Sequence, residues 1–210
     1  PRAKIEWSTI VQLKALQKIA DIGIVSGSPY DYIEDQISSM WSEINSLDPR
    51  RLIIMPCNGT KLYEFTKENI SRPGFVKTYE SSMIQYVGKE KYRILMSILT
   101  ELQKDTIDTQ KKLPLSGNFI SFRESMVNWC MIGRDASHEM RSEFKSLDDG
   151  LRIDLKARLD KRLVEMGLDN IVTSLGGNTS IDIYPKGWDK TYCLSHIPSN
   201  KKIYFVGDKC

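Results

Sequence analysis

Hydrophobic positions follow two different periods in the first part of the chain. Over residues 5–20 the apolar residues recur at close to helical spacing, which predicts a helix. Residues 21–28 read as a short buried strand that runs into a Ser/Gly turn, and residues 52–55 read as a second buried strand. Between them, residues 29–40 predict a helix with Pro29 near its first turn. Helices and strands that alternate in this order predict a parallel α/β sheet.

The pattern changes after the second of these strands. We expect residues 61–65 to form one arm of a hairpin and residues 71–74 to form a turn. Residues 88–108 have the charged, amphipathic pattern of a helix. A domain boundary is expected near residues 78–84.

The second half of the chain has four strand-like runs with two amphipathic helices among them, which is typical of an antiparallel α+β layer. The strands are expected at 117–122, 126–132, 171–175 and 179–184, and the helices at about 137–147, with Ser137 as its cap, and at 151–166. The final run, 201–208, reads as a buried strand ending in an acid, and it resembles the strands of the opening sheet.

The simplest architecture is therefore an α/β protein in which an α+β domain is inserted into a parallel-sheet core. We expect the first part of the core at 1–80, the inserted domain at 81–187 and the second part of the core at 188–210.

Composition argues against several classes of function. The 210 residues carry a net charge of +3, and their basic residues alternate with acidic ones, unlike the basic stripe of a nucleic-acid binder. The four cysteines and two histidines do not have the spacing of zinc ligands, so we expect reduced thiols in a cytosolic protein. No apolar run approaches the ~20 residues of a membrane span, and no signal peptide is visible.

The stretch from Gly176 to Lys190 holds the first candidate binding residues. Its alternation places Ser180 and Asp182 on one side of a strand and two isoleucines on the other. A hydroxyl and a carboxylate on one face suit a polyol, and the preceding glycines let the backbone come close to a ligand. The alternative is an ordinary hairpin with a solvated polar face.

Three arginines form the second constellation. Arg123 lies at a hairpin turn, Arg134 lies just past a strand, and Arg141 lies in the first turn of a helix. Helix N-termini attract anions, and the planar fork of arginine binds two phosphate oxygens at once. Together they could bind one phosphate. The alternative is that each arginine forms a surface ion pair with an acid close in sequence, namely Glu124, Asp135 or Glu139.

Four more side chains have a possible role at the core. Ser26 and Ser28 follow a strand at the carboxyl edge of the predicted sheet, where ligands gather, although they could simply cap a helix. Asp208 follows a strand-like run and could bind Mg²⁺, or could be a helix N-cap. Lys190 could neutralise a phosphoryl group as a point charge, or could be solvated.

The motifs, taken in order, resemble the eukaryotic-type phosphomannomutases of the haloacid dehalogenase superfamily. Each match is short, but the resemblance runs over nearly the whole chain and is strongest from Gly117 onward. The matching segments are Phe119-Ile-Ser-Phe-Arg123, Met126-Val-Asn128, Ile132-Gly-Arg134, Glu139 with Arg141, Gly176-Gly177, Ser180-Ile-Asp182, Gly187-Trp-Asp-Lys190 and Tyr204-Phe-Val-Gly-Asp-Lys209.

This resemblance implies a Rossmann-like core, an inserted cap and an active site between them. The implied reaction interconverts mannose 6-phosphate and mannose 1-phosphate, through an aspartyl-phosphate and a hexose 1,6-bisphosphate that also acts as the activator. Mg²⁺ is the implied cofactor, a homodimer formed through the caps is the implied assembly, and the product feeds GDP-mannose synthesis. Apolar surface on residues 88–108 would support such a dimer.

The resemblance also implies a role for particular residues. The non-reacting phosphate would be bound by Arg123, Arg134 and Arg141, and the sugar or its phosphate by Ser180 and Asp182. Arg2 and Asn178 would be further substrate contacts, although the family has Gln where Asn178 stands. The transferring phosphoryl group would be held by Ser26 or Ser28 with Lys190 beside it, and Asp208 would bind Mg²⁺.

The family's Asp-x-Asp-Gly-Thr loop is absent from the chain, and so is its Gly/Asn/Asp metal loop. We therefore expect a fragment whose nucleophile and acid/base aspartates lie outside it, and we expect no turnover by this chain alone. A sugar phosphatase of the same fold and a non-catalytic module that binds sugar phosphates are the alternatives. The three cap arginines favour the mutase, because a phosphatase does not need to bind a second phosphate.

Overall fold

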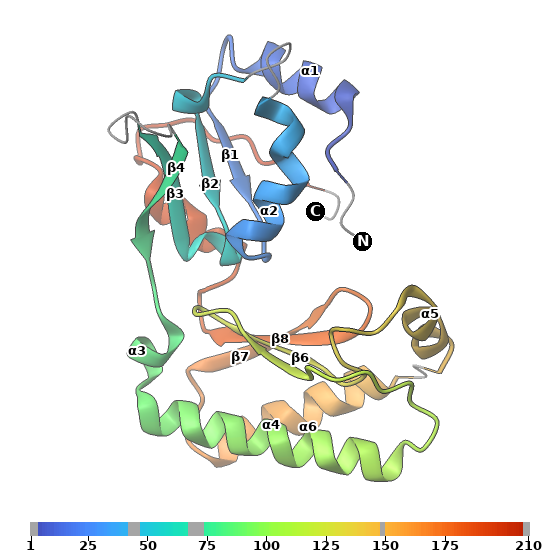
Figure 1. The fold of residues 1–210 in the computed structure, drawn as a ribbon. Helices are drawn as coiled ribbons and strands as arrows, with labels where there is room; N and C mark the ends of the chain where they lie inside the picture. Colours follow the sequence, from blue (N-terminus) through green and yellow to red (C-terminus); the bar gives the residue numbers. More distant parts are fainter. Residues whose placement is uncertain (1–3, 42–46, 67–73, 148–149, 208–210) are drawn as a thin grey trace. The chain divides into compact units, whose positions relative to one another are not determined.

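The structure is a computed structural model that describes residues 4–41, 47–66, 74–147 and 150–207. The chain divides into two compact units (Figure 1). The first unit joins Pro1–Tyr79 with Lys190–Cys210, and the second unit is Glu80–Asp189.

The first unit contains a four-stranded sheet in the order β1-β2-β3-β4. Its strands are β1 (Ile22–Val25), β2 (Leu52–Met55), β3 (Lys61–Thr66) and β4 (Gly74–Glu80). Strands β1 and β2 are parallel and β3 runs antiparallel to β2, which confirms both the parallel pair and the hairpin arm that the sequence predicts. The predicted turn at 71–74 falls mostly outside the described residues.

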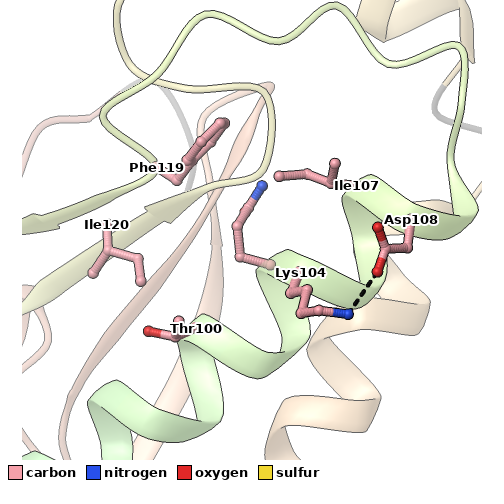
Figure 2. A pocket seen from close by; sticks show the side chains of 7 residues that line it. Thr100, Lys104, Ile107, Asp108, Phe119 and Ile120 are labelled. Atoms are coloured by element: carbon pink, nitrogen blue, oxygen red, sulfur yellow. Dashed lines mark hydrogen bonds and ion pairs between the residues drawn. The ribbon is translucent and has the colours of Figure 1, made fainter.

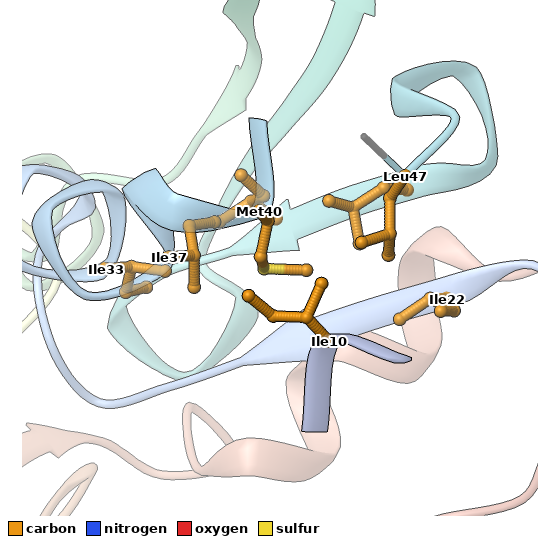
Figure 3. Packing of buried hydrophobic residues seen from close by; sticks show 8 residues of the cluster. Ile10, Ile22, Ile33, Ile37, Met40 and Leu47 are labelled. Carbon is orange, nitrogen blue, oxygen red and sulfur yellow. The ribbon is translucent and has the colours of Figure 1, made fainter. Parts of the chain in front are cut away.

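Two helices bury one face of this sheet. Ile10 of α1 (Trp7–Leu16) and Ile33 of α2 (Tyr30–Ile37) pack with Ile22 and Leu52 of the strands (Figure 3). Each such side chain contributes about 1.5–3 kcal/mol on burial. The apolar stripe predicted for residues 5–20 is only partly right, because the helix ends early and Ile19 is 83% exposed. The described part of the unit also contains the short 3-10 helices η1 (Ser38–Trp41), η2 (Pro49–Arg51), η3 (Cys57–Gly59) and η4 (Lys190–His196).

The second unit is the predicted α+β layer. Its antiparallel sheet has the order β5-β6-β8-β7, and helices α4 and α6 lie along one face (Figure 1). The elements are α3 (Met83–Val87), α4 (Lys89–Thr109), β5 (Ile120–Phe122), β6 (Val127–Cys130), α5 (His138–Leu147), α6 (Leu151–Glu165), β7 (Ile171–Gly176) and β8 (Ser180–Pro185). The fold is therefore α/β, with a Rossmann-like core and an inserted cap.

The prediction of a final strand at 201–208 is wrong for the part of this run that the structure describes. Residues 202–207 have no regular structure, and Tyr204, Phe205 and Val206 are 76%, 60% and 93% exposed. The run has the apolar composition of a strand, but a strand needs a hydrogen-bonding neighbour. In the described sheet β1 pairs only with β2, and residues 202–207 pair with neither.

Two further observations concern the chain as a whole. Among the described residues, no helix is both long and apolar enough to cross a membrane. Cys57, Cys130 and Cys193 are buried and form no disulfide among the described residues.

Candidate functional site

The cap sheet has one apolar face and one polar face, because its side chains alternate. Ile181 and Ile183 of β8 point to the helices and are fully buried. On the other face the register places Ser121, Asn128, Asp182 and Ser174 directly opposite one another, one from each strand. The predicted separation of Ser180 and Asp182 from the isoleucines is confirmed.

Asn128 connects the polar residues on this face. Its Nδ2 donates to Ser180 Oγ at 2.9 Å and to Asp182 Oδ1 at 2.6 Å, while its Oδ1 accepts from Nη1 of Arg134 at 2.9 Å. Ser180 Oγ in turn donates to the Gly176 carbonyl at 2.8 Å. Asn128 is only 3% exposed, and these bonds use both of its amide hydrogens.

Arg141 lies beside Arg134 and is held at three points. Its guanidinium donates to the carbonyls of Arg134, at 2.7 Å, and of Ala136, at 3.0 Å, and to Thr179 Oγ1 at 2.9 Å. Helix α5, which contains Arg141, begins where Ser137 Oγ accepts from the backbone N–H of Met140 at 3.2 Å, so the predicted cap is confirmed. The two arginines therefore project from neighbouring loop and helix positions.

Neither of these half-buried guanidinium groups pairs with a carboxylate among the described residues. The alternative that Arg134 and Arg141 are surface ion pairs with adjacent acids is thus contradicted. Glu139 instead accepts hydrogen bonds from Ser137 and from its own backbone N–H, which lower its pKa. Two positive charges with only neutral acceptors are a candidate anion site, since guanidinium groups bind phosphate oxygens strongly.

Gly176 leaves room for the carboxylate of this cluster. A Cβ added at Gly176 would lie 2.7 Å from Asp182 Oδ2 and 2.8 Å from its Cγ, closer than real Cβ contacts. Gly177 has a different role, because its φ of +51° lies in the left-handed region that a tight turn needs. Gly176 thus allows the close approach of the Asp182 carboxylate, and Gly177 allows the turn.

The two remaining predicted cap residues lie at turns. Arg123 is in the β5–β6 hairpin, where its backbone N–H donates to the Met126 carbonyl at 2.8 Å. Asn178 is exposed in the turn between β7 and β8. The structure therefore brings together Arg134, Arg141, Ser180 and Asp182 in one hydrogen-bonded cluster. Asn178 makes no bond to that cluster.

In the first unit, the loops after the two parallel strands are joined by hydrogen bonds. Backbone N–H groups of Cys57 and Asn58 donate to the carbonyls of Ser28, at 3.1 Å, and Ser26, at 2.8 Å. Ser26 Oγ accepts from the Ser28 N–H at 3.1 Å. Cys57 and Asn58 both have left-handed φ angles, 51° and 63°, which are costly for residues other than glycine. Such strain concentrates at functional sites.

The capping alternative for the serines of this loop is wrong. The N-cap of α2 is Pro29, and no side chain there caps the helix, so Ser26 and Ser28 stay available at the carboxyl ends of the strands. Lys190 is exposed at the start of η4. That segment packs on the same loop, because a Cβ on Gly59 would lie 2.7 Å from the backbone of Cys193.

Two predicted contacts, Arg2 and Asp208, lie outside the described residues. Among the residues that the structure does describe, no three His, Cys, Asp or Glu side chains gather as a metal site. These residues alone therefore do not fit a metal ion.

The sequence reasoning missed two members of the cap cluster, Asn128 and Thr179. In the sequence, Asn128 stands out only as part of the motif Met126-Val-Asn128. The available signal was a single amide inside the otherwise apolar run 126–132, because a buried polar side chain needs partners. Thr179 had no comparable signal, since a threonine before a strand is common.

Comparison with known proteins identifies relatives of the whole chain. The sequence profile described as eukaryotic phosphomannomutase matches residues 9–210. The phosphomannomutase of Schizosaccharomyces pombe is 32% identical over 212 residues, covering 99% of this chain and 75% of the relative. That of Saccharomyces cerevisiae is 39% identical over 157 residues, covering 72% of this chain and 55% of the relative.

Solved structures resemble the fold at much lower identity. The IMP-nucleotidase of Plasmodium falciparum superposes with a TM-score of 0.59 at 11% identity, over 91% of this chain and 50% of that chain. At this identity the likeness concerns the fold alone, and the chain spans about half the length of the nucleotidase. The profile match and these relatives show that this chain belongs to the eukaryotic phosphomannomutase family.

Proposed function

We propose that the chain serves the interconversion of mannose 6-phosphate and mannose 1-phosphate, by phosphoryl transfer through an aspartyl-phosphate and a hexose bisphosphate. The observation that supports this most is the pair Arg134 and Arg141, which have no carboxylate partner among the described residues. A mutase must bind the phosphate that is not reacting, and these guanidinium groups suit that task. The product would feed GDP-mannose synthesis.

Each unit contributes one group of polar residues to this reaction. In the cap, Arg134 and Arg141 bind phosphate oxygens, and Arg123 and Asn178 add contacts from the turns. Ser180 and Asp182 bind sugar hydroxyls, since a carboxylate with one hydrogen-bond partner still has oxygens that can accept.

In the core, Ser26 or Ser28 donates to the transferring phosphoryl group, and Lys190 supplies a positive charge. Phosphoryl transfer depends mainly on such positioning and charge neutralisation. Arg2 is proposed as a further substrate contact.

The family implies a metal cofactor, which we propose to be Mg²⁺ with Asp208 as one ligand. Bound Mg²⁺ would neutralise phosphate charge, and its preference for carboxylate oxygen agrees with this residue type. Calorimetric titration with Mg²⁺ tests the assignment, because Asp208→Asn should weaken binding of the ion. Unchanged binding would remove Asp208 from the ligand set.

Product analysis with mannose 1-phosphate distinguishes the mutase from a phosphatase. The protein expressed from its complete coding sequence should form mannose 6-phosphate, faster when a hexose 1,6-bisphosphate activator is added. Release of inorganic phosphate with no isomer would identify a phosphatase. Arg141→Ala should weaken bisphosphate binding by about 1.5–3 kcal/mol, the usual contribution of a charged hydrogen bond.

We further propose that two copies pair through the cap. A cavity of about 370 Å³ opens between α4 and β5, where Ile107 of α4 faces Phe119 and Ile120 (Figure 2). At its rim Lys104 and Asp108 form an ion pair of 2.7 Å. One positive and one negative group side by side are self-complementary under a two-fold axis, as an interface between identical copies requires.

Residues 88–108 offer little of the apolar surface that would support such a dimer, because the large apolar side chains of α4 are buried or half-buried. The proposed interface therefore depends on Phe119 and Ile120 as much as on the helix. Sedimentation analysis should give a dimer for the native chain and a monomer for Phe119→Glu. A native monomer at micromolar concentration would contradict the pairing.

We also propose a cytoplasmic location, since cysteines without a disulfide, such as buried Cys57, Cys130 and Cys193, are typical of a reducing compartment. Fractionation of the source cells tests it, and recovery from a secreted fraction would contradict it.

A further inference from the structure

Asn128 stands between two opposite charges on the cap sheet. On one side its Oδ1 accepts from the Arg134 guanidinium at 2.9 Å, and on the other its Nδ2 donates to the Asp182 carboxylate at 2.6 Å. The chemistry of the neighbours fixes this orientation of the amide, since a guanidinium can only donate and a carboxylate can only accept. The amide is 3% exposed, so water does not replace it readily.

Arg134 and Asp182 would otherwise neutralise each other. They share the same buried partner, yet they form no direct ion pair in the described structure. A guanidinium that pairs with a carboxylate loses much of its attraction for phosphate, and the carboxylate loses the lone pairs that would accept from sugar hydroxyls. Asn128 is neutral, and it satisfies both groups while keeping them apart.

We propose that Asn128 is a positioning residue of the substrate site, a neutral spacer that keeps Arg134 available for phosphate and Asp182 available for sugar hydroxyls. This inference rests on the proposed function of the cap cluster. Ser180 does not fill this role, because it reaches Asn128 through its hydroxyl, and that hydroxyl already donates to the Gly176 carbonyl.

A double-mutant cycle tests the spacer role against a merely structural one. Binding of glucose 1,6-bisphosphate is measured by calorimetry for the wild type, Asn128→Ala, Asp182→Asn and the double variant. Asn128→Ala should weaken binding about tenfold, since Arg134 then pairs with Asp182. In the Asp182→Asn background the same change should weaken binding less than about threefold, because the competing carboxylate is gone.

Ser121→Ala is the matched control, because Ser121 lies directly opposite Asn128 on the neighbouring strand. It should bind the bisphosphate as the wild type does. The proposal is overturned if Asn128→Ala lowers the bisphosphate affinity equally in the wild-type and Asp182→Asn backgrounds. It is also overturned if Asn128→Ala binds the bisphosphate with wild-type affinity.

A crystal structure of Asn128→Ala gives a readout that does not depend on the ligand. The spacer role predicts a direct ion pair between Arg134 and Asp182 in the variant. If that pair forms but the wild type binds no bisphosphate, the proposed function fails and the spacer role stands. If the two groups stay apart, the spacer role itself is wrong.

Discussion

Gly176 shows how one missing methyl group can shape a binding cluster. A Cβ there would lie 2.7 Å from the Asp182 carboxylate, so Gly176→Ala should push Asp182 away from Asn128 and weaken bisphosphate binding. Gly177→Ala is the matched control, because its Cβ would meet nothing within 4 Å although its φ of +51° makes alanine unfavourable by about 1 kcal/mol. Calorimetry and thermal unfolding separate the two effects. Equal binding by both variants would contradict the role of Gly176.

Asp48 makes stability depend on pH in the acid range. Its carboxylate accepts from the backbone N–H and the guanidinium of Arg50, and these bonds lower its pKa from 3.8 to about 2. A depressed pKa means that the folded state binds the proton less well, so the contribution is complete above about pH 4 and is lost as pH falls towards 2.

In Asp48→Asn the amide keeps an acceptor for the backbone N–H but does not titrate. Its free energy of unfolding should therefore fall less steeply between pH 4 and pH 2 than that of the wild type, as urea titrations at each pH would measure. The same slope in both proteins would show that Asp48 does not contribute.

At the scale of elements, helix α5 positions Arg141 through its first turn. Ser137→Ala removes the acceptor for the Met140 N–H and should destabilise the protein by about 1 kcal/mol. Fraying of this turn should also weaken bisphosphate binding, since Arg141 lies within it. Ser146→Ala near the other end of the helix is the control, because Ser146 Oγ donates only to the Glu143 carbonyl. Chemical denaturation and calorimetry of both variants check the prediction, and equal losses would refute it.

The elements could be predicted where a local pattern is sufficient. The run Leu52–Met55 forms β2 with the predicted bounds, because four apolar residues are followed directly by Pro56. The run at 201–208 also contains four consecutive apolar residues, 203–206, but it forms no strand as far as it is described, since pairing depends on a neighbour and not on the run itself.

Within the cap site, alternation along one strand predicted the side that Ser180 and Asp182 share. It could not predict Asn128 as their common partner, because the register between β6 and β8 decides which residues lie opposite each other.

At the scale of the whole molecule, an aromatic cluster ties the late part of the first unit to its early part. Tyr79 Oη and Tyr192 Oη lie 2.6 Å apart and are separated by 113 residues in sequence. His196 packs edge-on against the Tyr79 ring, and its Nε2 is 2.6 Å from the Gly59 carbonyl, in the loop that follows β2. These contacts hold the segment that begins at Lys190 against the loop that follows β2.

Tyr79→Phe should loosen this segment without unfolding the sheet. Loss of one hydrogen bond costs about 0.5–1.5 kcal/mol, so amide hydrogen exchange should become faster at residues 190–207. Tyr86→Phe is the control, because the Tyr86 hydroxyl makes no hydrogen bond within the described residues. If amide exchange at 190–207 is unchanged in Tyr79→Phe, the Tyr79 hydroxyl does not stabilise this segment.

The acceptors of Arg141 determine which nearby substitutions leave its guanidinium in place. Two of the three are main-chain oxygens, at positions 134 and 136, and a substitution of either side chain leaves those oxygens in place. Orthologues can therefore vary at Ala136 without moving the guanidinium, whereas a deletion that alters the path of this loop would displace it at once.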